Sequence, residues 1–191
     1  MLFRINNKLV VYNPIPKCGC TSVKSMIFYA LKGVKPDDQK NVHSAYPTRE
    51  RFKKNNLADY KFCVVRDPVE RFISGYSNRV LYHKDIPFVE FDDFVDNFSK
   101  FYKLDPIRHH LRPQVDFIGK DHNYYTNIFW VHQMKEVSIF LSQIAEKNIP
   151  TPHKQTGGSN QKPVPEKTQI EKIRLIYKSD YEFLNKLTIK K

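Results

Sequence analysis

Residues 8–33 predict a strand, a loop and a helix, and this unit constrains the fold more than any other part of the sequence. The run KLVVY at residues 8–12 is a β-branched stretch that stops at Pro14, as expected of a first strand. Apolar residues then recur at helical spacing over residues 21–32, and Gly33 is placed to cap that helix. A strand that passes through a tight loop into a helix is the phosphate-binding unit of parallel α/β proteins.

A second junction of the same kind lies at residues 60–79, YKFCVVRDPVERFISGYSNR. The apolar run that ends at Val65 predicts a buried strand. Asp67 is a good N-cap, Pro68 a good first helical residue, and Glu70 is spaced to complete a capping box with Asp67. We therefore expect a helix that runs to about residue 80.

The remaining sequence is mainly helical, with one more short strand expected at residues 126–131 and a helix at 134–147. Two terminal helices are expected near 167–178 and 180–188, the second opened by Ser179. An aromatic stripe at helical spacing predicts core packing and consists of Phe91, Phe94, Val95, Phe98 and Phe101. No composition break marks a domain boundary, so we expect a single domain over residues 1–191, with a helix-rich C-terminal half.

Composition indicates a globular protein with an anionic partner. Apolar residues make up 40% of the 191 residues and aromatic residues 14%, which excludes a disordered chain. Lysine and arginine number 32 against 20 acidic residues, a net charge of +12. Such a surplus favours nucleic acid, a membrane surface, a phosphorylated cofactor or an acidic polymer as the partner.

The cysteines and the N-terminal residues predict a cytoplasmic location. Three cysteines are a small and odd number, which argues against a disulfide framework. The CxC pair Cys18 and Cys20 has no second pair or HxxxH nearby to complete a zinc site. The stretch MLFRINNKLVVYNP has neither the apolar segment nor the cleavage site of a signal peptide. No apolar run approaches the roughly 20 residues that a transmembrane helix needs.

The loop at the first junction, PKCGCTS, has its lysine on the unusual side of the glycine. A nucleotide P-loop has the order GxxxxGK[ST], whereas Lys17 precedes Gly19 here. The amides around Gly19, Cys20 and Thr21 can converge on an anion at the helix N-terminus. Lys17 can reach the same anion, and Thr21 or Ser22 can add a hydroxyl donor.

The second junction offers a different anion site. Arg66 ends the strand, and Ser74 lies eight residues on, two turns along the next helix. An arginine fork and a hydroxyl group together suit a phosphate monoester. One ligand with two separated anionic groups would explain both junctions.

Together these motifs resemble those of sulfotransferases. PKCGCTS looks like their 5′-phosphosulfate loop, and RDPVERFIS looks like their 3′-phosphate motif. HLRPQVDFIG at 110–119 and IYKSDYEFL at 176–184 are similar to the branch that includes carbohydrate sulfotransferases. The resemblance, over about residues 8–187, implies a P-loop-like three-layer α/β fold with a small central parallel sheet flanked by helices. It also implies 3′-phosphoadenosine 5′-phosphosulfate as donor, and no metal.

The resemblance further implies roles for individual residues. The donor-binding residues are Lys17, Cys18, Gly19, Cys20, Thr21, Ser22, Arg66 and Ser74. Lys17 is also catalytic, and His43 in NVHSAYP matches the position of the base that takes the acceptor proton. Apart from the resemblance, His109 or His110 is the alternative base, and Glu50 would serve instead if the acceptor lies over residues 49–54. The acceptor is a hydroxyl of a saccharide, glycolipid or polysaccharide, for which His110, Arg112 and Gln114 are contacts or wall residues.

Several points stay open at the level of sequence. Arg71 is expected to form a structural ion pair with Asp67 or Glu70, and residues 154–162 are either a mobile anion clamp or a linker. A small-molecule kinase, a basic nucleic-acid-binding module and an inactive nucleotide-binding relative are the alternative functions. No RNA- or DNA-binding motif accompanies the charge, so nucleic acid is not the expected partner.

Overall fold

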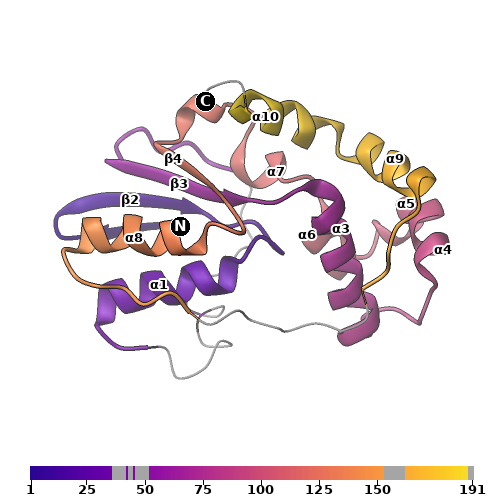
Figure 1. Cartoon of the computed structure of the whole chain (residues 1–191), viewed down its shortest axis with the longest axis horizontal. Helices are drawn as coiled ribbons and strands as arrows, with labels where there is room; N and C mark the ends of the chain where they lie inside the picture. Colours follow the sequence, from indigo (N-terminus) through magenta and orange to yellow (C-terminus); the bar gives the residue numbers. More distant parts are fainter. Residues whose placement is uncertain (36–41, 43–44, 46–51, 153–161, 189–191) are drawn as a thin grey trace. The chain divides into compact units, whose positions relative to one another are not determined.

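The structure is a computed structural model that describes residues 1–35, 42, 45, 52–152 and 162–188. The chain forms two compact units (Figure 1). The first unit comprises Met1–Val65 and Phe117–Gln155, and the second comprises Arg66–Asp116 and Thr156–Lys191. The single domain expected over residues 1–191 stays a prediction.

The first unit is built on a four-stranded sheet. Its strands are β1 (Leu2–Ile5), β2 (Lys8–Asn13), β3 (Tyr60–Val65) and β4 (Asn127–Trp130), in that spatial order. β2, β3 and β4 are parallel, so their carboxyl ends meet at one edge of the sheet. The sequence-predicted α/β fold with a small parallel sheet is confirmed, and all three strands that the sequence predicted are present.

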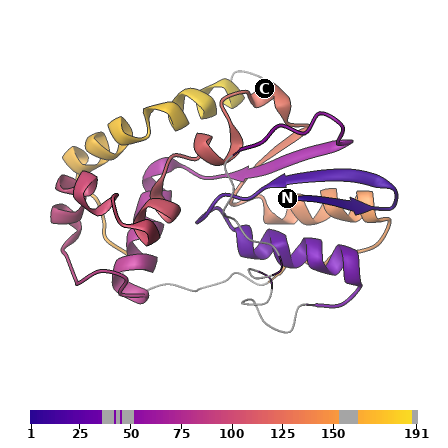
Figure 2. The same cartoon turned by 180° about the vertical axis from the view of Figure 1, so that it is seen from behind.

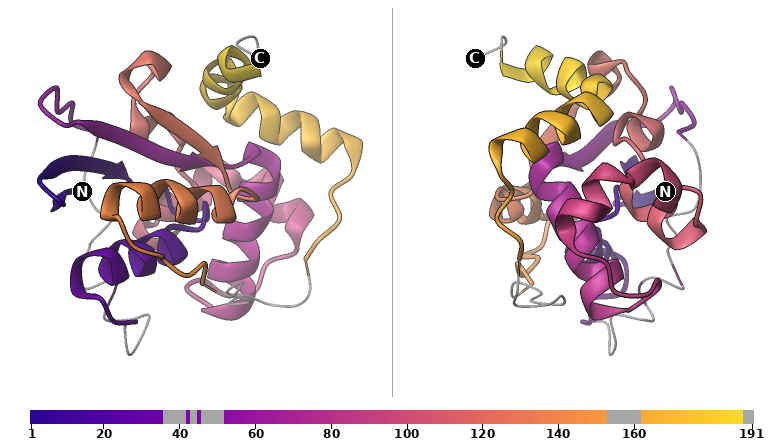
Figure 3. Two further views of the ribbon diagram at one scale, coloured as in Figure 1. Left: turned by 60° about the vertical axis from the view of Figure 1, so that its left-hand side comes forward. Right: turned by 90° about the vertical axis from the view of Figure 1, so that its right-hand side faces the viewer.

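Two helices, α1 (Cys20–Lys32) and α8 (Met134–Ala145), lie side by side against one face of this sheet (Figure 3). The rings of Tyr12 and Phe62 stack across neighbouring strands, with centroids 4.8 Å apart. Gly33 caps α1 in the left-handed conformation, as predicted, and its N–H donates to the carbonyl of Tyr29 at 2.8 Å. The core contains Val10, Tyr12, Val23, Met26, Ile27, Phe62, Val64, Val137, Phe140, Leu141 and Ile144.

The strand β1 was not predicted and adds an antiparallel edge to the sheet (Figure 2). Ile5 pairs with Lys8, so Asn6 and Asn7 form a two-residue hairpin turn. Their φ angles of 44° and 62° are the left-handed values of a type I′ turn, which asparagine tolerates. The Asn-Asn pair was therefore a hairpin signal in the sequence.

The second unit is helical. It contains α3 (Pro68–Tyr76), the π-helix η1 (Ser77–Tyr82), α4 (Phe91–Asp96), α5 (Phe98–Phe101), α6 (Asp105–Leu111), α9 (Lys167–Ile176) and α10 (Lys178–Thr188). Phe72 of α3 is fully buried, and its ring contacts those of Phe94, Phe98 and Tyr177. The aromatic stripe predicted from the sequence is thus confirmed as core, with Phe101 half-buried against it.

Two short helices, α7 (Val115–Ile118) and η2 (His122–Tyr124), lie between α6 and β4 in the sequence. At the C-terminal end, α10 begins at Lys178, so Ser179 lies inside the helix and the prediction that it opens the helix is wrong. The capping box belongs to α9 instead, where Glu166 and Gln169 form it reciprocally. Within the described residues, every helix is too short or too polar to cross a bilayer.

Candidate functional site

The first predicted anion loop lies between β2 and α1 in the first unit. Lys17 and Gly19 both take left-handed φ angles, 68° and 70°. Gly19 is the N-cap of α1, and its carbonyl accepts the first helical hydrogen bond from Val23 at 3.1 Å. The N–H groups of the first helical turn therefore belong to Cys20, Thr21 and Ser22. They carry the partial positive charge of the helix N-terminus, which favours an anion.

The loop packs tightly against the β4–α8 connection. A side chain on Gly19 would collide with the Met134 methyl group and approach Val131 to 3.7 Å. Cys18 is fully buried, and its N–H donates to Ile15 at 3.2 Å. Glycine is thus favoured at position 19 by its φ angle, and a Cβ atom there would force the end of the Met134 side chain to move.

Cys18, Cys20 and Cys63 form no disulfide and lie near the buried Tyr12 hydroxyl. Burial raises the pKa of Tyr12, and the three cysteines raise it further. Burial also raises the pKa of Cys63, with a smaller contribution from Cys18. A thiol with a raised pKa stays protonated at neutral pH, so Cys63 is a packing residue here.

The second predicted anion site lies in the second unit, where Arg66 precedes α3. Its Nε atom lies 3.2 Å from a carboxylate oxygen of Glu70, and 19% of its side chain is exposed. Asp67 caps α3 as predicted, because its carboxylate accepts from the Glu70 N–H at 3.0 Å. The capping box expected of Asp67 and Glu70 differs on the Glu70 side, because the Glu70 carboxylate pairs with Arg66. Ser74 is half-buried, two turns along α3.

Arg71 does not have the partner expected from the sequence. It is fully buried, and its two terminal nitrogens donate to the carbonyls of His110 at 3.0 Å and Arg112 at 2.9 Å. The carboxylate of Asp67 caps α3 and also accepts from the Tyr181 hydroxyl at 3.1 Å. Arg71 is therefore structural, as expected, but it binds main-chain carbonyls at the end of α6.

The residues predicted to contact the acceptor lie in the last turn of α6 and just after it. Gln114 is 1% exposed, and both ends of its side-chain amide bond the main chain of Arg66. His110 is half-buried, and its Nδ1 atom lies 2.9 Å from the carbonyl of Pro106. Arg112 is half-buried after α6. The structure thus brings Gln114 to Arg66, a link that the sequence did not predict.

His43 lies outside the described residues, as do Glu50 and residues 153–161, which include most of the predicted clamp. The alternative bases His109 and His110 are neighbours on α6, with ring centroids 5.0 Å apart.

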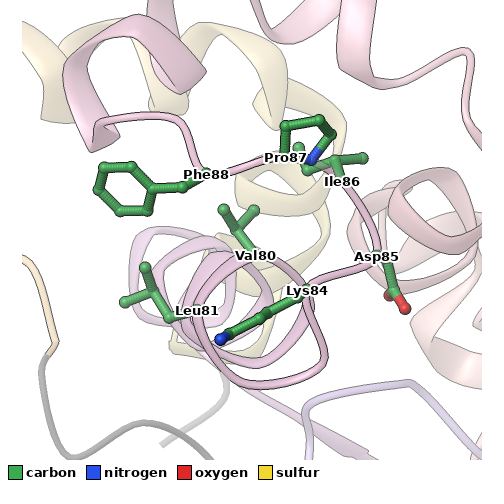
Figure 4. A pocket seen from close by; sticks show the side chains of 7 residues that line it. All are labelled: Val80, Leu81, Lys84, Asp85, Ile86, Pro87 and Phe88. Atoms are coloured by element: carbon green, nitrogen blue, oxygen red, sulfur yellow. The ribbon is translucent and has the colours of Figure 1, made fainter.

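A cavity of about 660 Å³ lies in the second unit, at η1 and the chain that follows it (Figure 4). Its lining residues are Val80, Leu81, Lys84, Asp85, Ile86, Pro87 and Phe88. None of these is a predicted site residue. Among the described residues, no cluster of three or more histidine, cysteine or acidic side chains is arranged to hold a metal ion.

Comparison with known proteins identifies the class of protein to which the chain belongs. The chain matches the sulfotransferase family over residues 2–186, nearly its whole length. The chain therefore belongs to the sulfotransferase family, and its two loops are the parts of the sequence that resemble the family's donor motifs. No curated protein sequence matches it significantly. The protein is a sulfotransferase, a class of enzymes that act on hydroxyl acceptors.

Proposed function

We propose that the protein transfers the sulfuryl group of 3′-phosphoadenosine 5′-phosphosulfate to a hydroxyl of a carbohydrate. The observation that carries the proposal is the loop between β2 and α1, in a chain of this family. Lys17 precedes the N-cap Gly19, so a cation and a helix N-terminus lie on one short loop. This combination suits a group with the charge of a phosphosulfate.

In this proposal the two anion sites bind the two ends of one donor. Lys17 and residues 18–22 bind the 5′-phosphosulfate through the ammonium group, the helix amides and the hydroxyls of Thr21 and Ser22. Arg66 and Ser74 bind the 3′-phosphate, because a guanidinium and a hydroxyl suit a phosphate monoester. The loop follows β2, Arg66 follows β3 in the chain, and β2 and β3 are parallel neighbours.

The reaction is an in-line displacement at sulfur. The acceptor oxygen forms a bond to sulfur while the bond from sulfur to the 5′-phosphate oxygen breaks, which releases adenosine 3′,5′-bisphosphate. Lys17 neutralises charge on the leaving phosphate, and a base takes the acceptor proton. We propose His43 as that base, with His109 or His110 as the alternative.

The role of His43 has a direct kinetic test. His43→Ala is expected to lower kcat by about 10²-fold, which is typical of the loss of a general base. An enzyme with His43→Ala and near-normal turnover would remove His43 from the mechanism.

The acceptor is tested with labelled donor. Saccharides, glycolipids and polysaccharides are incubated with sulfur-labelled 3′-phosphoadenosine 5′-phosphosulfate, and label in the product is counted against Lys17→Ala as control. The net charge of +12 favours an anionic saccharide. Label transferred only to non-carbohydrate hydroxyls, such as phenols or steroids, would refute the carbohydrate acceptor and leave the sulfuryl transfer intact.

We propose a cytoplasmic location. The three cysteines form no disulfide, and two of them, Cys18 and Cys63, are buried, which suits a reducing compartment. Fractionation of cells with an antibody to the protein tests this, and recovery in a secreted or luminal fraction would contradict it.

A further inference from the structure

Gln114 holds the main chain of Arg66 at two points. Its Oε1 atom accepts from the Arg66 N–H at 3.1 Å, and its Nε2 atom donates to the Arg66 carbonyl at 2.8 Å. The Gln114 amide thus bonds both the N–H and the carbonyl of Arg66, as a residue on a neighbouring β-strand would. Because Gln114 is 1% exposed, water does not compete for these bonds as it would at the surface.

Gln114 is held in turn by Asp180 near the start of α10. The carboxylate of Asp180 accepts from the N–H of Gln114 at 2.9 Å and from the N–H of Val115 at 3.0 Å. Asp180 is also 1% exposed. Burial raises the pKa of Asp180, while these two N–H donors and the charge of Arg71 lower it.

Residues 110–115 are fixed at further points on the same stretch. Arg71 donates to the carbonyls of His110 and Arg112, and the Tyr177 hydroxyl donates to the carbonyl of Leu111. Arg71, Tyr177 and Asp180 are all buried, and they come from α3, from the junction of α9 and α10, and from α10. Buried side chains therefore hold the main chain of residues 110–115 in place. The side chain of Gln114 in turn bonds the main chain of Arg66, so the position of Arg66 depends on this stretch.

We propose that Gln114, held by Asp180, is a positioning residue that sets the place of Arg66 for the donor's 3′-phosphate. The inference rests on the proposed function, in which Arg66 binds that phosphate. Arginine gives up much rotamer freedom when it binds, and a fixed main chain lowers the part of that cost that comes from the backbone. Without Gln114 the main chain of Arg66 loses these two hydrogen bonds, while its guanidinium keeps the pairing with Glu70.

The test is the ratio of affinities for adenosine 3′,5′-bisphosphate and adenosine 5′-monophosphate, measured by calorimetry without magnesium. In the wild type the bisphosphate is expected to bind about 10- to 100-fold more tightly, as for hydrogen bonds to a charged group. Gln114→Leu is expected to lower this ratio by about five-fold or more, toward the value for Arg66→Ala. A general loss of packing would weaken both ligands alike and leave the ratio unchanged.

Gln169→Leu is the matched control. Gln169 is also a buried glutamine of the second unit, and its amide bonds the Glu166 N–H and Asp92 but not Arg66. This variant is expected to keep the wild-type ratio. A folded Gln114→Leu protein that keeps the wild-type ratio overturns the proposal; if that variant does not fold, Asp180→Asn replaces it with the same two outcomes. A wild type without any preference for the bisphosphate would instead refute the proposed role of Arg66.

Discussion

Lys17 holds a backbone conformation that favours glycine. Its φ of 68° places a long side chain in the left-handed region, where a non-glycine residue costs about 1 kcal/mol or more. Strain of this kind persists where surrounding structure enforces it, and it is common at functional sites. The conformation of Lys17 thus lowers the stability of the fold. In the proposed mechanism it also places a cation just before α1.

Replacement of Lys17 separates these two effects. Lys17→Gly and Lys17→Ala are both expected to lower kcat by about 10²-fold or more, because both remove the charge. Lys17→Gly is expected to exceed Lys17→Ala in free energy of unfolding by about 1 kcal/mol, since only alanine keeps the strain. Urea denaturation and steady-state kinetics measure the two quantities. An unchanged kcat in either variant would exclude a catalytic Lys17.

Glu70 competes for the guanidinium that the donor is proposed to need. Its carboxylate lies 3.2 Å from Arg66 Nε, and its side chain is 61% exposed. A pair this exposed is worth about 0–1 kcal/mol, so Glu70→Gln is expected to tighten adenosine 3′,5′-bisphosphate binding by about two- to five-fold. Glu182→Gln, an exposed residue of α10, controls for the change in net charge. Weaker binding in Glu70→Gln would mean that the carboxylate orients Arg66.

Single residues differed in how far the sequence could predict them. The cap at Asp67 was predictable because a cap depends on neighbours within three residues. The partners of Arg71 were not, because they are main-chain carbonyls about 40 residues away, and any residue type presents a carbonyl. Gln114 was noticed only through the family resemblance, and its contact with Arg66 spans 48 residues.

At the scale of elements, periodicity predicted the strands and helices that bury one face. β2, β3, β4, α1 and α8 were found within two or three residues of their predicted bounds. β1 was missed because the strand has only four residues and most of them are exposed. Its sequence therefore shows little of the apolar alternation that marks a buried strand. The π-helix η1 was expected as a continuation of α3, because a change from α to π hydrogen bonding leaves little trace in apolar spacing.

The packing of α3 on α6 depends on Gly75. A Cβ atom there would fall on the side chain of Leu111, which is fully buried. Gly75→Ala is therefore expected to cost about 1–3 kcal/mol of unfolding free energy, as overpacked cores do. Leu111→Ala should offset part of that cost, so the double variant is less destabilised than the sum of the two single variants.

Gly33→Ala is the control for this pair. Gly33 is left-handed at φ 75° with open space around it, so its cost of about 1 kcal/mol should add to that of Leu111→Ala without coupling. Thermal or urea unfolding of the five variants gives the coupling energy. Additive costs for Gly75→Ala and Leu111→Ala would contradict the close approach of the two helices.

For the whole molecule, composition predicted an anionic partner but could not name it. The +12 charge is spread along the sequence, and the same surplus would suit a nucleic acid. The pairing of two loops narrowed the choice to a ligand with two anionic groups, and the match over residues 2–186 established the family. The acceptor could not be predicted, because its recognition depends on surfaces that no short motif encodes.

The central claim is that the protein binds a donor with a 5′- and a 3′-anion and needs no metal to do so. Thermal unfolding with adenosine 3′,5′-bisphosphate, without magnesium, tests it most directly. At a hundred times its dissociation constant the ligand adds about 2.7 kcal/mol, which raises Tm by about 5–10 °C for a chain of this size. ATP with magnesium at the same concentration should raise Tm less. A larger shift with ATP and magnesium than with the bisphosphate would contradict the account.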